Sequence, residues 1–132
     1  MIIDKFQVLI VEDEAIVSMD LRYKLESLGY SVPAEVRSGE DAVHAASQLR
    51  PDVVLMDIRL SGEMDGIEAA AEIRRRFDIP VIYVTSSVDE ATLERAKATE
   101  PSGYILKPFL NAELRAVVEM AIHSTRRELH GE

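Results

Sequence analysis

The chain has 132 residues, 47% of them apolar, which suits one globular domain with a hydrophobic core of its own. Its 24 acidic and 15 basic residues give a formal net charge of -9, which disfavours nucleic acid and anionic membrane surfaces as partners. The absence of cysteine excludes disulfides, thiol catalysis and thiolate metal sites. The sequence has no span of about 20 apolar residues and no basic, apolar leader, so we expect a soluble cytoplasmic protein.

Five apolar runs typical of β-strands alternate with segments whose apolar residues recur every three to four positions. The expected strands are residues 6–11, 31–36, 53–56, 79–84 and 103–106. This alternation predicts a parallel sheet with helices on both faces, a (βα)5 arrangement. Pro33 cannot donate a hydrogen bond to a neighbouring strand, so the second strand belongs at an edge. The flavodoxin-like order 2-1-3-4-5 puts it there, and we predict that order in a single domain of residues 1–132.

The predicted helices have recognisable ends. Gly29 is expected to end the first helix as a C-terminal cap. Three later helices open with a capping side chain and an acidic residue three positions further on. These pairs are Ser38 with Asp41, Asp65 with Glu68, and Ser87 with Glu90. The fifth helix has an apolar face from Leu114 to Ile122, and the polar segment 123–132 is expected to fray, which leaves a core over residues 6–124.

The stretch DVVLMDIRL carries a fully apolar run, residues 53–56, directly into one carboxylate, Asp57. In open α/β sheets, functional sites lie at the carboxyl ends of the strands, where the loops diverge. Residues with reactive side chains stand at or just after four of the expected strand ends. They are Glu12 and Asp13, Asp57, Thr85, and Lys107. The sequence therefore predicts that three carboxylates, a hydroxyl and an ammonium group converge on one rim of the sheet.

These groups suit phosphoryl transfer. Three carboxylates at one place repel one another unless a cation neutralises them, and Mg2+ takes oxygen ligands of this kind. Lys107 is a compact second counter-charge for a phosphoryl group, and Thr85 can donate a hydrogen bond to a phosphoryl oxygen. Asp57 could then attack phosphorus and form an acyl phosphate. We predict an electrostatic cradle in which positioning and charge neutralisation do most of the catalysis.

Five short motifs follow one another along the expected elements: VEDE after the first strand, LMD after the third, MDG opening the third helix, VTS after the fourth strand and YILKPF after the fifth. Each motif alone is weak, but all five in this order are specific. With them, residues 6–124 resemble the receiver domain of two-component response regulators. The resemblance implies a phosphorylation-operated switch whose own reactions are limited to its phosphorylation and dephosphorylation.

The resemblance also implies a role for each residue of the rim. Asp57 would accept a phosphoryl group from a histidine kinase or a histidine phosphotransfer protein. Glu12 and Asp13 would hold Mg2+ together with Asp57 and the backbone carbonyl of Arg59. Lys107 would contact the phosphoryl group.

Two further residues would form the switch. Thr85 would move towards the phosphoryl group, and Tyr104, three residues before Lys107, matches the aromatic switch residue of the family. The bond between Lys107 and Pro108 is typically cis in such domains. The face made by the fourth helix, the fifth strand and the fifth helix would change its contacts with a downstream protein or a second copy of the chain. Taken alone, Thr85 is better explained as a β-branched strand residue and Tyr104 as a partly buried edge aromatic.

The sequence departs from the family pattern in two places. The stretch after Asp57, IRLSGEMDG, is one residue longer than usual and lacks the usual proline, so we expect a longer and more mobile loop. The residue before Tyr104 is Gly103, where the family often has aspartate. In one subfamily of transcription factors that aspartate forms an ion pair between subunits, so its absence argues against that dimer.

Two alternative interpretations stay open. A magnesium-dependent phosphatase of the haloacid-dehalogenase kind also uses an aspartate nucleophile, but after its first strand as D-x-D, where this chain has EDEA. The chain could also be the receiver part of a longer hybrid kinase or transcription factor.

His44, His123 and His130 have no acidic cluster of ligand spacing beside them and are interpreted as surface residues. The arginines at 74–76 are interpreted as the solvated end of the third helix.

Overall fold

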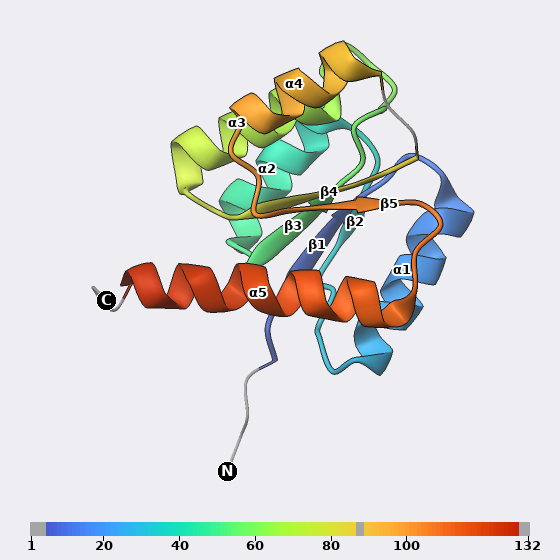
Figure 1. Ribbon diagram of the computed structural model, residues 1–132, viewed down its shortest axis with the longest axis vertical. Coiled ribbons are helices and arrows are strands. Elements are labelled where there is room, and N and C mark those ends of the chain that lie inside the picture. Colours follow the sequence, from blue (N-terminus) through green and yellow to red (C-terminus); the bar gives the residue numbers. More distant parts are fainter. Residues whose placement is uncertain (1–4, 87–88, 130–132) are drawn as a thin grey trace.

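The structure is a computed structural model that describes residues 5–86 and 89–129, without the side chains of residues 125–129. Within these residues, five parallel strands and five helices alternate along the chain (Figure 1). The strands are β1 (Val8–Val11), β2 (Glu35–Val36), β3 (Val53–Met56), β4 (Val81–Thr85) and β5 (Gly103–Leu106). The helices are α1 (Ala15–Ser27), α2 (Gly39–Leu49), α3 (Gly66–Phe77), α4 (Glu90–Ala98) and α5 (Asn111–Leu129).

The sheet has the predicted order β2-β1-β3-β4-β5, so the chain has the flavodoxin-like fold. β2 lies at an edge, as Pro33 indicated, but it is two residues long instead of the six expected. Gln7 and Ser31 form an isolated pairing on the other side of Pro33. Proline lacks the N–H group that would continue the ladder, so the strand is interrupted there.

The other strand boundaries differ little from the expected ones. β3 and β5 coincide with the predicted runs. β4 begins at Val81 instead of residue 79, because Pro80 cannot donate a ladder hydrogen bond, and it includes Thr85. β1 begins at Val8 instead of residue 6.

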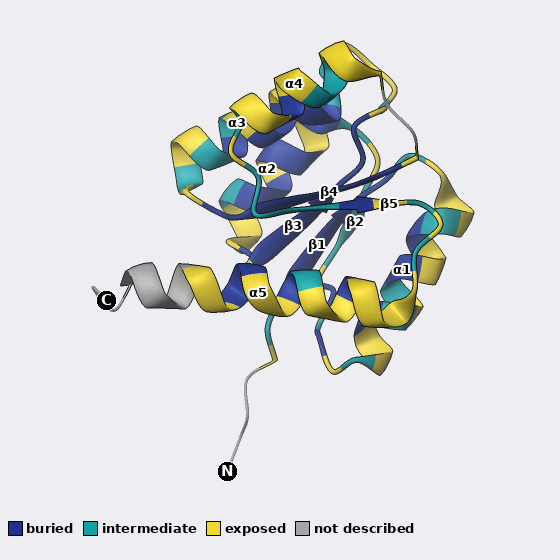
Figure 2. Cartoon of the chain, viewed as in Figure 1, coloured by how far each residue is buried: buried dark blue, intermediate teal, exposed yellow. Residues whose placement is uncertain are grey.

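Helices cover both faces of the sheet, α1 and α5 on one and α2, α3 and α4 on the other (Figures 1 and 2). The central strands β1, β3 and β4 lie between these layers, and all their residues are buried. The apolar face predicted for the last helix packs into the cluster that α1 and α5 cover, with Leu114, Val118, Ala121 and Ile122 buried. Within the described ranges, every helix is too short or too polar to cross a lipid bilayer.

Gly29 ends α1 as predicted. Its φ is +98°, a left-handed conformation that favours glycine. Its N–H donates to the carbonyl of Glu26 at 3.0 Å, and the N–H of Tyr30 donates to the carbonyl of Leu25 at 3.0 Å. These two bonds are the Schellman motif, which satisfies carbonyls that the helix leaves free.

Two of the predicted N-terminal caps are present. The Ser38 side chain accepts a hydrogen bond from the N–H of Asp41 at 3.1 Å and opens α2. Asp65 and Glu68 form a reciprocal capping box at the start of α3. Both helices therefore begin where their sequence pattern placed them.

The predicted cap of α4 is wrong. Ser87 lies outside the described residues, and α4 begins at Glu90 with Asp89 as its cap, whose carboxylate accepts from the N–H of Thr92 at 2.7 Å. Asp89 satisfies the same free N–H groups two residues later in the chain. Among the nine residues of α4, all of them described, only Ala96 is buried.

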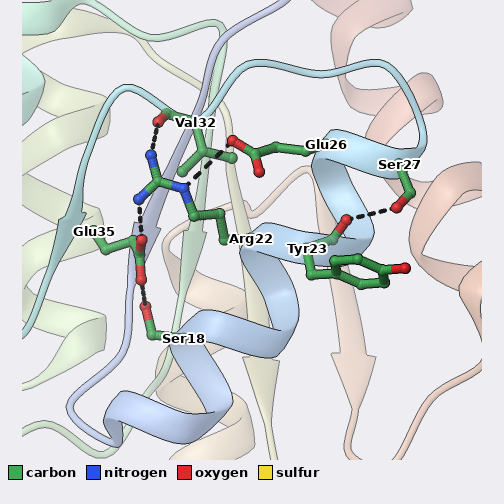
Figure 3. A network of polar contacts seen from close by, with 7 residues as sticks. All are labelled: Ser18, Arg22, Tyr23, Glu26, Ser27, Val32 and Glu35. Carbon is green, nitrogen blue, oxygen red and sulfur yellow. Dashed lines mark hydrogen bonds and ion pairs between the residues drawn. The ribbon is translucent and has the colours of Figure 1, made fainter.

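A polar network ties the short edge strand β2 to α1 (Figure 3). The Glu35 carboxylate of β2 accepts a hydrogen bond from Ser18 at 2.6 Å and forms an ion pair with Arg22. Arg22 also donates to the backbone carbonyl of Val32 at 3.0 Å. With so few ladder hydrogen bonds of its own, β2 is held in place by these side chains.

The helix α5 packs so closely on β5 that Gly103 has no room for a side chain. A Cβ atom there would lie 2.4 Å from the Val117 side chain. This contact gives a packing reason for glycine where the family often has aspartate. α5 extends to Leu129, so residues 123–129 are helical, whereas residues 130–132 lie outside the described part and the expected fraying stays a prediction.

Candidate functional site

The register of the sheet brings the predicted residues to one rim. Val11 pairs with Met56, so the residues that follow them, Glu12 and Asp57, end adjacent strands. On the other side, Thr85 of β4 pairs with Leu106 of β5, and Lys107 follows directly. The N–H of Lys107 donates to the carbonyl of Thr85 at 2.8 Å, which continues the ladder by one step. The side chains of the rim are thus placed by backbone pairing.

The carboxylates of Glu12, Asp13 and Asp57 form one cluster, with an oxygen of each within 4.8 Å of the others. Glu12 and Asp57 are buried, at 2% and 6% exposure, whereas Asp13 is partly exposed. The Lys107 ammonium lies 2.7 Å from Glu12 Oε1 and 3.4 Å from Asp57 Oδ2. This lysine is the positive charge that the structure provides to the two buried carboxylates.

The pKa values of Glu12 and Lys107 are shifted by burial and by neighbouring charges. Burial raises the pKa of Glu12 above its ordinary value, and the neighbouring Asp57 charge adds to that, while the hydrogen bond from Lys107 opposes it. Burial on its own would lower the pKa of Lys107. The hydrogen bond to Glu12 and the charge of Asp57 outweigh burial and raise that pKa. Lys107 therefore stays protonated at neutral pH.

The cluster fits a magnesium ion by its donor chemistry. Its three groups offer carboxylate oxygens, the hard ligands that this ion takes, and they share a rim where water can complete the coordination. Backbone N–H groups orient two of the carboxylates. Asp57 Oδ1 accepts from the N–H of Arg59 at 3.1 Å, and Glu12 Oε2 accepts from the N–H of Glu14 at 3.1 Å. Arg59, a loop residue of the expected ligand set, is thus hydrogen-bonded to Asp57 through its backbone N–H.

Thr85 and Tyr104 carry buried hydroxyl groups with no hydrogen-bond partner among the described residues. An unpartnered buried hydroxyl costs roughly 1–3 kcal/mol, so each of these groups gains free energy from any arrangement that provides a partner. The Tyr104 ring packs edge-on against the ring of Tyr83 at 6.2 Å between centroids. Both predicted switch residues are therefore placed with an unused hydrogen-bonding capacity.

Tyr83 is a residue of this region that the sequence patterns do not single out. It pairs with Tyr104 across β4 and β5 and precedes Thr85 by two positions, so all three share one face of the sheet. Its hydroxyl lies 2.7 Å from Thr99 Oγ1, just beyond α4. The period-two alternation of β4 was the available signal, because it puts Tyr83 and Thr85 on the same face.

Gly66 of the MDG motif touches the phosphoacceptor candidate through the backbone. A Cβ atom at Gly66 would lie 1.9 Å from the carbonyl oxygen of Asp57. The N–H of Gly66 donates to the carbonyl of Ile58 at 2.9 Å. The first turn of α3 therefore closes directly on Asp57, and glycine alone fits there.

The lengthened loop after Asp57 is attached to its surroundings. Ser61 Oγ donates to Asp13 Oδ2 at 3.1 Å, and Ser61 also pairs with Ser38 in an isolated bridge. The greater mobility expected of this loop stays a prediction, and these contacts oppose it. The Lys107–Pro108 bond at the other side of the rim is cis.

The remaining candidate residues lie away from the rim. His44 is exposed on α2 and His123 is exposed on α5, as expected of surface residues, and His130 lies outside the described residues. The arginines at 74–76 form the last turn of α3.

Replacement of Lys107 by methionine is expected to lower the free energy of unfolding by about 3–5 kcal/mol in metal-free buffer, because two buried carboxylates then lack a counter-charge. Lys97→Met is the matched control. Its partner Glu94 is 68% exposed, and losing such a surface pair costs about 0–1 kcal/mol. Urea denaturation of both variants measures the difference. Equal losses would contradict the proposed dependence of the rim on Lys107.

Comparison with known proteins agrees with this geometry. The family model of the response regulator receiver domain matches residues 8–119. The chain is 36% identical over 120 residues to the transcriptional regulatory protein PdtaR of Mycobacterium tuberculosis, and 36% identical over 130 residues to the phyllosphere-induced regulator PhyR of Methylorubrum extorquens. These alignments cover 91% and 94% of the chain but 58% and 48% of the relatives, so the chain spans about half the length of these curated proteins.

Solved structures of receiver domains are also similar to this chain. The signal receiver domain of a modulated diguanylate cyclase from Desulfovibrio desulfuricans G20 has a TM-score of 0.90 and 46% identity, covering 95% of this chain and 99% of that one. The receiver domain of the sensor histidine kinase PA1611 from Pseudomonas aeruginosa PAO1, with a magnesium ion coordinated in its active-site cleft, has a TM-score of 0.82 and 32% identity, covering 91% and 99%. The rim of strand-end residues, the family model and these relatives agree, and the chain belongs to the receiver domains of two-component response regulators. The members of this family are signalling switches rather than conventional enzymes.

Proposed function

We propose that the chain is a single receiver domain that accepts a phosphoryl group on Asp57 from a histidine kinase or a histidine phosphotransfer protein. The observation that carries this proposal is the position of Asp57, a buried carboxylate at a central strand end with the Lys107 ammonium 3.4 Å from its Oδ2. No other carboxylate among the described residues ends a central strand beside both a cation and an unpartnered hydroxyl. A cytoplasmic location is proposed from the family alone.

In the transfer step, a carboxylate oxygen of Asp57 forms a bond to phosphorus. The bond from phosphorus to the imidazole nitrogen of the donor breaks, and that nitrogen keeps the electron pair and takes a proton from solvent. Lys107 already contacts Asp57, so its charge stays beside the oxygens of the incoming phosphoryl group. Water later attacks phosphorus, the bond from phosphorus to the Asp57 oxygen breaks, and inorganic phosphate leaves with Asp57 free again, the one other reaction proposed for the chain.

Magnesium would be held by Glu12, Asp13 and Asp57, with the backbone carbonyl of Arg59 as a further ligand. When bound, the ion supplies positive charge beside the phosphoryl oxygens. The grouping of the three carboxylates and the magnesium ion in the PA1611 receiver domain support this assignment. A phosphatase of the haloacid-dehalogenase kind is not favoured, because the candidate nucleophile follows β3 instead of β1.

The protein donor is proposed to dock over an exposed apolar stripe of α1. Ile16, Met19 and Tyr23 are 82%, 66% and 72% exposed and lie on one side of the helix at spacings of three and four. α1 begins three residues after Glu12, next to the rim. A groove of about 370 Å3 lies beside this stripe and is lined in part by Ile16 and Lys107. A phosphohistidine-bearing protein that covers the stripe thereby reaches Asp57.

The output is proposed to be a change of the face made by α4, β5 and α5. α4 has one buried residue, so little packing opposes its rearrangement. It follows closely on Thr85, whose unpartnered hydroxyl gains a hydrogen bond when it moves to a phosphoryl oxygen. Tyr104 can then turn into the vacated space and find its own partner. The altered face would bind a downstream protein or a second copy of the chain.

Asp57→Asn is expected to keep the fold and lose the mass increment of one phosphoryl group after incubation with acetyl phosphate and magnesium, because the amide is not a nucleophile for phosphorus. Intact mass spectrometry measures the increment. Asp52→Asn, at the opposite end of β3, is the matched control and is expected to be phosphorylated like the unaltered chain. Full phosphorylation of Asp57→Asn would show that another residue is the acceptor.

Met19→Asp is expected to slow phosphorylation by a phosphorylated histidine phosphotransfer domain that is active on the unaltered chain, at least tenfold, since about 1.4 kcal/mol of lost docking free energy suffices. Phosphorylation by acetyl phosphate should stay unchanged. Met120→Asp on α5 is the control, because Met120 is 68% exposed and lies on another helix. If both variants respond alike to the protein donor, α1 is not the docking face.

Amide hydrogen exchange is expected to change more in α4 and β5 than in α2 when a phosphoryl mimic such as beryllofluoride occupies the site with magnesium. The reason is that α4 has one buried residue, whereas α2 has five, so α4 is held less firmly and rearranges more easily. Mass spectrometry of peptic peptides measures the exchange. A uniform response, or one restricted to residues 57–66, would contradict the proposed output face.

A further inference from the structure

The strand order brings two loops together above the end of β1. β1 lies between β2 and β3, so the segments that leave β2 and β3 flank the residues that follow β1. Ser38, two residues after β2, and Ser61, in the loop after β3, pair across this gap. Asp13, which follows Glu12 at the end of β1, contacts both of these segments.

Both segments bind Asp13. The Arg37 guanidinium donates to the backbone carbonyl of Asp13 at 2.9 Å, and Ser61 Oγ donates to Asp13 Oδ2 at 3.1 Å. The backbone and the carboxylate of Asp13 are thus held separately, by two different segments. Ser61 belongs to the stretch IRLSGEMDG that follows Asp57.

Backbone contacts fix the position of Ser61. At the base of the loop, the N–H of Gly66 donates to the carbonyl of Ile58 at 2.9 Å. Near the tip, Gly62 has a φ of +102°, a turn conformation suited to glycine. Gly39 lies so close to the loop that an added Cβ would be 2.8 Å from the carbonyl oxygen of Met64. Because the loop is held at its base and along its outer part, the hydroxyl of Ser61 is presented to Asp13 by the fold.

Asp13 differs from the other two carboxylates in what holds it. Lys107 contacts Glu12 and Asp57, and among the described residues Asp13 forms no ion pair. It is also the least buried carboxylate of the cluster, so its side chain has the most freedom to rotate. A single hydrogen bond that fixes such a carboxylate reduces the ordering cost when it becomes a metal ligand.

We propose that Ser61 is a positioning residue of the magnesium site, which holds the Asp13 carboxylate within reach of Glu12 and Asp57 before the metal binds. This proposal rests on the magnesium site proposed above. The loop after β3 then has a consequence for the rim, because Ser61 brings a hydroxyl donor to the carboxylate that Lys107 does not contact.

The test is magnesium binding by the full chain, measured by isothermal titration calorimetry and by the rise of the melting temperature with magnesium concentration. Ser61→Ala is expected to weaken binding about tenfold, at the lower end for loss of a group that orients a metal ligand, because the bond is exposed. Ser61→Thr keeps the hydroxyl and should bind nearly as well as the unaltered chain. Ser47→Ala is the control, since it removes an exposed hydroxyl that bonds only within α2. Asp13→Ala removes a proposed ligand and shows how much magnesium binding is lost when that ligand is missing.

Each outcome decides the proposal. Weaker binding by Ser61→Ala, recovery by Ser61→Thr and no effect of Ser47→Ala support it. Unchanged or tighter binding by Ser61→Ala overturns it, as does a loss of stability in metal-free buffer with unchanged magnesium affinity, which is the result expected of a purely structural serine. If the unaltered chain does not respond to magnesium at all, the metal site itself is refuted, whereas a response that Asp13→Ala loses and Ser61→Ala keeps refutes Ser61 alone.

Discussion

The Lys107 ammonium, at the end of β5, lies against the buried carboxylates of Glu12 and Asp57, at the ends of β1 and β3. Burial of an ionised carboxylate costs several kcal/mol without a counter-charge. Lys107 supplies this charge to both carboxylates, so the three strands can end together at one rim. The same ammonium is the group that an incoming phosphoryl oxygen would meet. The charge that stabilises the resting domain and the charge that would stabilise the phosphorylated one are therefore carried by one side chain.

The rest of the rim is arranged around this contact by backbone geometry. Parallel pairing sets Glu12 beside Asp57, and the glycine of MDG lets α3 close on the Asp57 carbonyl. Thr85 stands on the neighbouring strand with a buried hydroxyl that has no partner among the described residues. The unpartnered hydroxyl of Thr85 is thus on a different strand from the ends that carry Glu12 and Asp57. In the proposed switch, β1 and α3 would support Asp57 on one side, and β4 and α4 would respond on the other.

The fold and most of the rim could be predicted from the sequence because they depend on local patterns. Apolar runs fix the positions of β3 and β5, Pro33 indicates the edge strand, and Gly29 marks the end of α1. Boundaries were missed where proline shortened a strand and where Asp89, not Ser87, caps a helix. Contacts between distant segments were also missed. Ser61 and Asp13 are 48 residues apart in the chain, and no periodicity relates them, so only the three-dimensional order of the strands reveals their hydrogen bond.

The edge strand β2 has a consequence for how copies of this domain can crowd together. An open strand edge offers free N–H and carbonyl groups on which another chain can add its own strand, the first step of sheet-to-sheet aggregation. Here that edge is two residues long, is preceded by Pro33, and has the carbonyl of Val32 occupied by Arg22. So short and interrupted an edge is a poor template, and copies of the domain at high concentration can lie side by side without their sheets joining along β2.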